Sequence, residues 1–186
     1  MLLVITGEPG VGKSTLLLKV ASNLRDIGVN VYALIAREIR VNGIRRGFEF
    51  IDLITNSTVN LALVKDNADV DYGISIGRYI VDINGCKRAA ALLRDAIRAD
   101  YMLVLFDEIG PMELASEDLS NTLIELLHSN KDVIAVVHKR IKHKVADMYK
   151  AKADKIIEVT KGNRDALLKY IIDYYLMEGS KRSNRL

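Results

Sequence analysis

One glycine-rich segment near the start of the chain constrains the fold most. Residues 7–14 read Gly-Glu-Pro-Gly-Val-Gly-Lys-Ser, and they follow an apolar run over residues 2–5. Glycines at this spacing let the backbone turn so tightly that several N–H groups point inward, a geometry that cradles phosphate oxygens. A helix that begins at this point adds the positive end of its dipole. The segment therefore predicts a strand, a phosphate-binding loop of the Walker A type and a helix, in that order.

The residues after the loop favour this interpretation over a glycine-rich turn that arose by chance. Leu17, Val20, Ala21 and Leu24 recur at helical spacing and form one apolar face. A buried-type strand before the loop and an amphipathic helix after it are the context in which such loops bind nucleoside triphosphates. We therefore expect a nucleotide to bind here.

The loop supplies most of the candidate nucleotide contacts. Lys13 would neutralise the β- and γ-phosphate oxygens and so take part in catalysis, and the Ser14 hydroxyl would bind Mg²⁺. The residues expected to contact the nucleotide are Gly7, Glu8, Pro9, Gly10, Val11, Gly12, Lys13, Ser14 and Thr15.

Length and composition favour one globular domain. The chain has 186 residues, 49% of them hydrophobic and 27% charged, with a net charge of +3. It has no linker-like segment and no apolar stretch as long as a membrane span, so we expect one domain over residues 1–178 and a polar, basic tail over residues 179–186. Cys86 is the only cysteine, which excludes an internal disulfide and favours the cytoplasm. The modest net charge does not require a nucleic-acid partner.

Apolar runs predict a mainly parallel sheet. The runs do not alternate polar and apolar residues, as is typical of strands covered on both faces. They lie at residues 2–5, 29–35, 102–106, 133–137 and 156–159. Amphipathic segments between them predict helices, so we expect a doubly wound α/β fold.

The stretch from residue 41 to residue 82 breaks this rhythm and predicts a short antiparallel β excursion. Strand-like runs at residues 48–54, 59–64 and 74–81 follow one another without a helix. The acidic turn at residues 65–73 lacks the glycine and glutamate positions of a calcium-binding loop, so we expect a solvated turn there.

An acidic pair provides the second half of a triphosphate site. Asp107 and Glu108 directly follow the apolar run at residues 102–106. Phosphoryl chemistry needs a carboxylate that helps to hold Mg²⁺ and a group that orients the attacking water, best placed at the end of a neighbouring strand. We expect Asp107 to serve the metal as a Walker B acid and Glu108 to be the catalytic base. The alternative is a pair of acids that opens a surface turn, which the uninterrupted buried strand before them disfavours.

Beyond this pair the chain resembles a known family. Residues 107–114 read Asp-Glu-Ile-Gly-Pro-Met-Glu-Leu, which resembles the Asp-Glu-Ile-Gly-x-Met-Glu-Leu segment of the small nucleoside-triphosphatase family that includes the human cancer-related nucleoside triphosphatase and thermophile relatives. Three further blocks resemble that family: Glu38, Ile39, Arg40, Gly43, Arg45, Gly47 and Phe48; Gly77, Arg78, Tyr79 and Val81; and Thr160, Asn163 and Arg164. The resemblance spans almost the whole chain.

The resemblance implies Mg²⁺-dependent hydrolysis of ATP, GTP, CTP and UTP to nucleoside diphosphate and phosphate, with low base selectivity. It also implies the additional-strand, RecA-like order of the P-loop NTPase fold, in which the run at residues 133–137 lies between the strand of Asp107 and the loop strand. His138, just past that intervening strand, would then contact the γ-phosphate or the attacking water as a sensor. The alternative is a histidine that faces solvent at a strand end.

Two basic groups have more than one interpretation. Arg37, Arg40, Arg45 and Arg46 form the densest arginine group, from which we expect Arg40 to offset the charge on the transferred phosphoryl group. A pair between Glu38 and Arg40, solvated surface and a nucleic-acid groove are the alternatives. Arg164 would stack on the nucleotide base, which suits low base selectivity because a guanidinium reads only the π-face.

The basic run at residues 138–144 lacks interleaved aromatics, so we expect a solvated helix start there.

Three functions fit these residues. A hydrolase is favoured because Asp107 and Glu108 equip the site for water and the chain shows no separate acceptor domain. In a small-molecule or polynucleotide kinase, Glu108 would accept a proton from a substrate hydroxyl and the excursion at residues 41–82 would bind the acceptor. In a nucleotide-dependent switch, slow hydrolysis would time the release of an RNA or protein partner. We expect a monomer that binds a nucleoside triphosphate with Mg²⁺ and does not bind a membrane.

Overall fold

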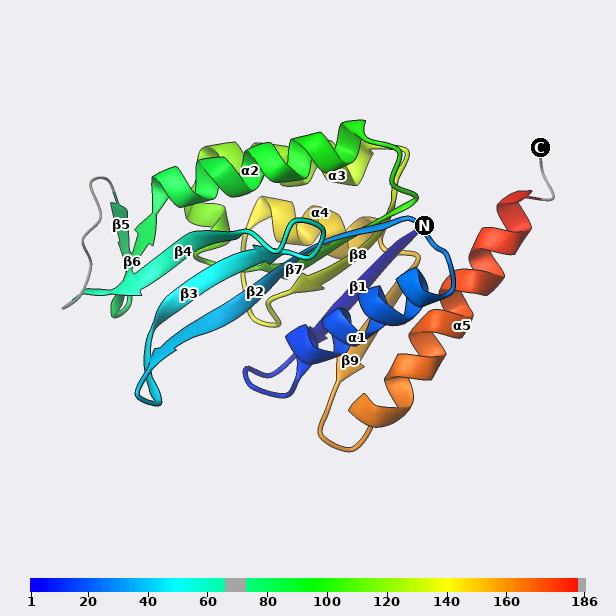
Figure 1. Ribbon diagram of the computed structural model, residues 1–186, viewed down its shortest axis with the longest axis horizontal. Helices are drawn as coiled ribbons and strands as arrows, with labels where there is room; N and C mark the ends of the chain where they lie inside the picture. Colours follow the sequence, from blue (N-terminus) through cyan, green and yellow to red (C-terminus); the bar gives the residue numbers. More distant parts are fainter. Residues whose placement is uncertain (66–72, 184–186) are drawn as a thin grey trace.

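The protein is described by a computed structural model that covers residues 1–65 and 73–183, with side chains as far as Gly179. Within these residues, nine strands form one sheet in the order β5-β6-β4-β3-β2-β7-β8-β1-β9 (Figure 1). The strands are β1 (Leu2–Gly7), β2 (Val31–Val41), β3 (Ile44–Asp52), β4 (Thr58–Val64), β5 (Gly73–Ile76), β6 (Tyr79–Asp82), β7 (Leu103–Ile109), β8 (Asp132–Val137) and β9 (Lys155–Val159). The helices are α1 (Lys13–Asp26), α2 (Ile83–Arg98), α3 (Glu117–His128), α4 (Lys144–Lys152) and α5 (Arg164–Ser183), with a short 3₁₀ turn, η2 (Glu113–Ala115).

The parallel half of the sheet has the expected strand order. β2, β7, β8, β1 and β9 pair in parallel, and β8 lies between β7 and β1. This confirms the α/β fold and the additional-strand arrangement. Since parallel strands share one carboxyl edge, the segments that follow β1, β7, β8 and β9 come together there.

The antiparallel half differs in three ways from the expected strands. β3 spans Ile44–Asp52, where a strand was expected over residues 48–54. β2 runs to Val41, six residues past its predicted end, and pairs with β3 as a hairpin. Residues 74–81 were expected as one strand, but they form the hairpin β5–β6 because Gly77, at a φ of 55°, turns the chain back with Ile76 paired to Tyr79. Most of the turn expected at residues 65–73 lies outside the described residues.

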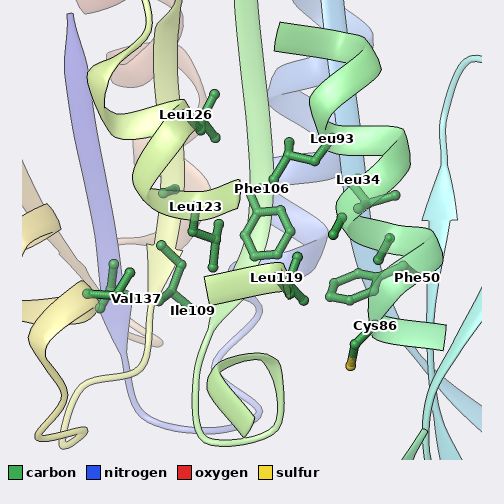
Figure 2. Packing of buried hydrophobic residues seen from close by; sticks show 14 of the residues in the cluster. Leu34, Phe50, Cys86, Leu93, Phe106, Ile109, Leu119, Leu123, Leu126 and Val137 are labelled. Carbon is green, nitrogen blue, oxygen red and sulfur yellow. The ribbon is translucent and has the colours of Figure 1, made fainter. Parts of the chain in front are cut away.

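Helices cover both faces of the sheet and enclose two apolar layers (Figure 1). α2, α3 and α4 cover one face and α1 and α5 the other. In the first layer, Phe106 of β7 lies between the α3 residues Leu119 and Leu123 and the strand residues Leu34 and Phe50 (Figure 2). The Phe50 and Phe106 rings have centroids 5.5 Å apart. This packing holds β7 rigidly up to the point where Asp107 begins.

Local sequence sets the starts of two helices. The Asp82 side chain accepts a hydrogen bond from the Gly85 N–H at 2.8 Å and so caps α2. Ser116 caps α3 through the Leu119 N–H, at 3.4 Å. At the other end of the chain, α5 continues to Ser183, so the helix includes Gly179 where we expected a tail to begin; residues 184–186 lie outside the described part.

None of the helices in the described residues is long and apolar enough to cross a membrane.

Candidate active site

The phosphate-binding loop joins β1 to α1 at the carboxyl edge of the sheet (Figure 1). Gly12 precedes the helix in a left-handed conformation, φ 104°, that side chains rarely adopt. At Gly7 a Cβ atom would lie 2.5 Å from the Val159 carbonyl oxygen, so only glycine lets the loop pack this closely on β9. The chain therefore forms the expected turn, with the N-terminus of α1 at its end.

The Lys13 side chain folds back over this loop. Its Nζ donates to the carbonyl oxygens of Gly7 and Glu8, both at 3.1 Å. Lys13 carries a charge, yet only 7% of the residue's surface is exposed. An ammonium held by two loop carbonyls lies where the loop would receive an anion.

Asp107 is the most informative carboxylate in the protein. It is fully buried, and neither of its carboxylate oxygens has a hydrogen-bond partner among the described residues. Burial raises the pKa of Asp107 to about 7, while the nearby Ser14 hydroxyl and Lys13 ammonium oppose the rise. A buried carboxylate without a partner costs folding free energy unless a cation joins it. Asp107 and Ser14 offer the hard oxygen donors that Mg²⁺ prefers, so these residues fit the metal.

Glu108 follows at a break in the strand pairing. Asp107 pairs with Val136 and Ile109 with Val137, which leaves Glu108 without a partner on β8. The peptide bond between Asp107 and Glu108 is cis. A bulge re-aims the side chain of the extra residue, and Glu108 lines the cleft beside the loop. Asp107 and Glu108 are adjacent in sequence but lie in different surroundings. The Asp107 carboxylate is buried, whereas Glu108 lines the cleft.

The cleft has a volume of about 510 Å³ and joins the loop to the β2–β3 hairpin. Loop, sheet and hairpin all contribute to its walls. The lining residues are Pro9, Gly10, Gly12, Lys13, Ser14, Thr15, Ala36, Arg37, Glu38, Arg45, Phe48, Glu108 and His138. The cleft thus brings together the predicted residues Lys13, Ser14, Glu108 and His138.

Arg40 is not among the residues that line this cleft, which corrects our choice from the arginine group. The β2–β3 pairing shifts register between Ile39 and Arg40, and the Arg40 guanidinium bonds to Glu38 at 2.8 Å and to the Gly43 carbonyl at 2.8 Å. Arg45 lines the cleft instead. Its guanidinium also pairs with Glu38 and lies 5.5 Å from the centre of the Phe48 ring.

Arg37, Glu38 and Phe48 also line the cleft, and the sequence alone identified them only in part. Arg37 and Glu38 line the cleft because β2 extends past its predicted end. Arg37 pairs with Glu49 at 2.6 Å. Phe48 belongs to the same arginine- and glycine-containing block as Arg45, so that block contributes residues to the cleft wall although Arg40 is not one of them.

Arg164 lies on the other side of the loop. It lines a second pocket of about 350 Å³ with Gly12, Thr15, Leu16, Lys19, Asp165 and Leu168. A Cβ atom at Gly12 would lie 3.7 Å from the Arg164 Cδ, so this side chain packs directly beside the loop. Asn163 holds the turn before α5, because its Oδ1 accepts from the Thr160 N–H at 2.8 Å.

The basic run after β8 is mostly exposed and leads into α4, as expected, and two of its side chains also pair with an acid of the loop. Lys139 lies 3.2 Å from the Glu8 carboxylate and 2.6 Å from that of Glu158, and Arg140 lies 3.0 Å from Glu8. Hydrogen bonds from Lys139 and Arg140 lower the pKa of Glu8. Glu8 therefore joins the phosphate loop to the segment that carries His138.

Comparison with known proteins identifies the family. A family model described as NTPase matches residues 2–172 of this chain. The chain belongs to this NTPase family. The nucleoside-triphosphatase THEP1 of Methanosarcina acetivorans is 38% identical over 176 residues, which cover 94% of this chain and 96% of that protein. The protein of the same name from Methanocaldococcus jannaschii is 34% identical over 176 residues, covering 95% and 98%. The NTPase described here is therefore an enzyme that acts on nucleoside triphosphates.

Solved structures agree with this NTPase in fold. The crystal structure of THEP1 from the hyperthermophile Aquifex aeolicus superposes with a TM-score of 0.77 and 26% identity, covering 94% of this chain and 98% of that one. The solution structure of a human cancer-related nucleoside triphosphatase gives a TM-score of 0.77 and 27% identity, covering 94% and 96%. The resemblance to this family and the P-loop fold of the NTPase are thus confirmed.

Proposed function

We propose that this NTPase hydrolyses nucleoside triphosphates to nucleoside diphosphate and phosphate, with Mg²⁺ held by Ser14 and Asp107. The observation that carries the proposal is the different placement of two adjacent acids. Asp107 is buried and neither of its carboxylate oxygens has a hydrogen-bond partner among the described residues, which leaves both available to a metal ion, while Glu108 opens into the cleft that Lys13 also lines. Bound Mg²⁺ would neutralise charge on the phosphates, and Glu108 would orient or deprotonate a water molecule.

Arg45 takes the role that we first gave to Arg40. A cation is worth most where negative charge grows during phosphoryl transfer, and Arg45 lines the cleft with Lys13 whereas Arg40 does not. Glu38 pairs with the Arg45 guanidinium and orients it. His138, also in the cleft wall, remains our candidate for a sensor of the γ-phosphate or the attacking water.

Low base selectivity is proposed from the second pocket. Its wall offers the Arg164 guanidinium and the aliphatic side chains of Leu16 and Leu168. A guanidinium plane and apolar contacts favour any planar base alike. The charged groups of Lys19 and Asp165 also border this pocket, so the comparison among the four ribonucleotides is a necessary part of the test.

We further propose that the enzyme acts as a monomer in the cytoplasm. The free, buried thiol of Cys86 fits a reducing compartment. Light scattering at micromolar concentration tests the first point, and a dimer peak would contradict it.

The decisive experiment measures phosphate release from ATP, GTP, CTP and UTP, with Mg²⁺ and with EDTA. Wild type, Lys13→Ala and Glu108→Gln are compared. We expect release from all four nucleotides only with Mg²⁺, loss of nucleotide binding in Lys13→Ala, and a kcat about 10²-fold lower in Glu108→Gln with binding retained. Full activity in Glu108→Gln would show that another group orients the water. If label from the γ-phosphate appears on an organic acceptor and not as free phosphate, the enzyme is a kinase and the hydrolase proposal is wrong.

A further inference from the structure

Glu113 is a buried acid that the proposed chemistry does not yet use. It lies in η2, between the end of β7 and α3, and is 5% exposed. Within the described residues no lysine or arginine forms an ion pair with it. Buried glutamates without a charged partner are rare, because the carboxyl group loses its hydration. Glu113 therefore needs a structural or functional reason for its place.

The hydrogen bonds of Glu113 lead to the turn after Glu108. Its Oε2 accepts from the Gly110 N–H at 3.1 Å. The Gly110 carbonyl oxygen in turn accepts from the Leu114 N–H at 3.1 Å. Both backbone groups of Gly110 are thus held by the segment that contains Glu113, so the chain cannot shift at Gly110 without breaking one of these bonds.

Gly110 is also the point at which three side chains meet. A Cβ atom at Gly110 would lie 3.0 Å from the Glu113 Oε2, 3.6 Å from the Glu108 Cγ and 3.7 Å from the His138 Cβ. The Ile109 carbonyl accepts from the His138 N–H at 3.0 Å and joins the same turn to β8. Glu113 packs against one side of Gly110, and the two cleft residues pack close by.

We propose that Glu113 is a positioning residue for hydrolysis, because its bond to Gly110 holds the backbone that directs the Glu108 carboxylate into the cleft. This inference rests on the proposed role of Glu108. At the bulge, Glu108 has no strand partner on β8 that would hold it in place. The Gly110 bond supplies that restraint two residues further along the chain.

The protonation of Glu113 agrees with this role. Burial, together with the nearby charges of Glu108 and Asp107, raises the pKa of Glu113 to about 8. A neutral carboxyl group can still accept from the Gly110 N–H through its carbonyl oxygen. The acceptor, and not the negative charge, is then what the turn requires. Glutamine should replace Glu113 in function, whereas a side chain of similar length without an acceptor should not.

The test compares Glu113→Gln with Glu113→Met. Both variants remove the ionisable group and keep the approximate volume, but only glutamine retains an oxygen acceptor. We expect kcat to fall about 10-fold or more in E113M, with KM for Mg-ATP unchanged within about 2-fold, and to stay within about 3-fold of wild type in E113Q. Glu117→Gln is the matched control, because Glu117 is an exposed acid on α3 outside the cleft. Rates are divided by the concentration of nucleotide-binding sites, measured with a fluorescent nucleotide, so that misfolded protein does not lower them.

Equal rates in E113M and wild type would overturn the proposal, and so would equal losses in E113Q and E113M. If E113M does not fold, Gly110→Ala tests the same contact with Glu113 intact, because the added methyl group pushes against the Glu113 Oε2. We expect the kcat of Gly110→Ala to fall while its KM stays unchanged. A wild-type kcat in Gly110→Ala would contradict the positioning role of Glu113. A fully active Glu108→Gln would instead remove the proposed role of Glu108 on which this inference rests, which keeps the two failures distinct.

Discussion

The Glu8 carboxylate in the phosphate loop lies 3.0 Å from the Arg140 guanidinium, a contact between residues 132 positions apart in the chain. Lys139 lies 3.2 Å from the same carboxylate. One acid at the loop therefore offsets two cations beside a site for a highly charged anion. The balance of charge around the phosphates depends on this contact.

Substitution of Glu8 by glutamine should strengthen nucleotide binding at low salt. Removal of the carboxylate leaves Arg140 free to attract the triphosphate, whereas Lys139 still lies 2.6 Å from Glu158, and exposed charges of this kind are screened by salt. We expect KM for Mg-ATP to fall about 2- to 5-fold at 20 mM salt, with the difference lost near 1 M salt. Glu117→Gln serves as the control for a change in net charge. A higher KM in Glu8→Gln would mean that the carboxylate supports the loop shape instead.

Substitution of Asp107 by asparagine should separate stability from activity. Asp107 is buried and its carboxylate oxygens have no hydrogen-bond partner in the described part of the chain. Loss of an uncompensated buried charge should raise the free energy of unfolding by about 1–3 kcal/mol at pH 8 in EDTA. Phosphate release should fall, and the Mg²⁺ concentration for half-maximal activity should rise. Urea unfolding and a magnesium titration measure the two effects, and an Asp107→Asn variant with normal magnesium dependence would exclude Asp107 from the metal site.

Alanine substitutions at Arg45 and Arg40 should differ strongly in effect. Only Arg45 lines the cleft, although both guanidinium groups bond to Glu38. We expect kcat to fall at least about 10²-fold in Arg45→Ala and to change by less than about 3-fold in Arg40→Ala. The two variants control for each other, since each removes one arginine from the same hairpin. A larger loss in Arg40→Ala would restore our original choice.

The stability of the protein should depend on pH through Glu113. The pKa of its carboxyl group rises from 4.5 to about 8 on folding, mainly through burial and also through the charges of Glu108 and Asp107. Between these two values the folded state binds more protons than the unfolded state, so the free energy of unfolding falls as pH rises and levels off above pH 8.

Glu113→Gln cannot ionise and should lose this part of the pH dependence. The stability of Glu113→Gln relative to wild type should therefore increase from pH 5 to pH 8 in urea unfolding without Mg²⁺. Parallel curves for the two proteins across that range would show that Glu113 does not change its pKa on folding.

Several parts of the site follow from sequence because they depend on short stretches of chain. The glycines at positions 7, 10 and 12 determine the loop shape through backbone freedom, and Lys13 and Ser14 come with it. Asp107 and Glu108 follow a buried run directly, so the strand and its acids could be predicted together, although β7 continues through both acids to Ile109. The parallel strands could also be predicted, because a strand covered on both faces is apolar nearly throughout.

The tertiary structure decided which side chains from distant segments meet. Arg45 lines the cleft and Arg40 does not, although the two residues are paired across β2 and β3 and both bond to Glu38. The burial of Glu113 depends on the turn packed between β7 and α3. Glu8 and Arg140 meet because the order of β8, β1 and β9 brings their loops to one edge. Local sequence thus determined the loop and the acidic pair, whereas contacts across the sheet depend on strand order and register, which are properties of the whole fold.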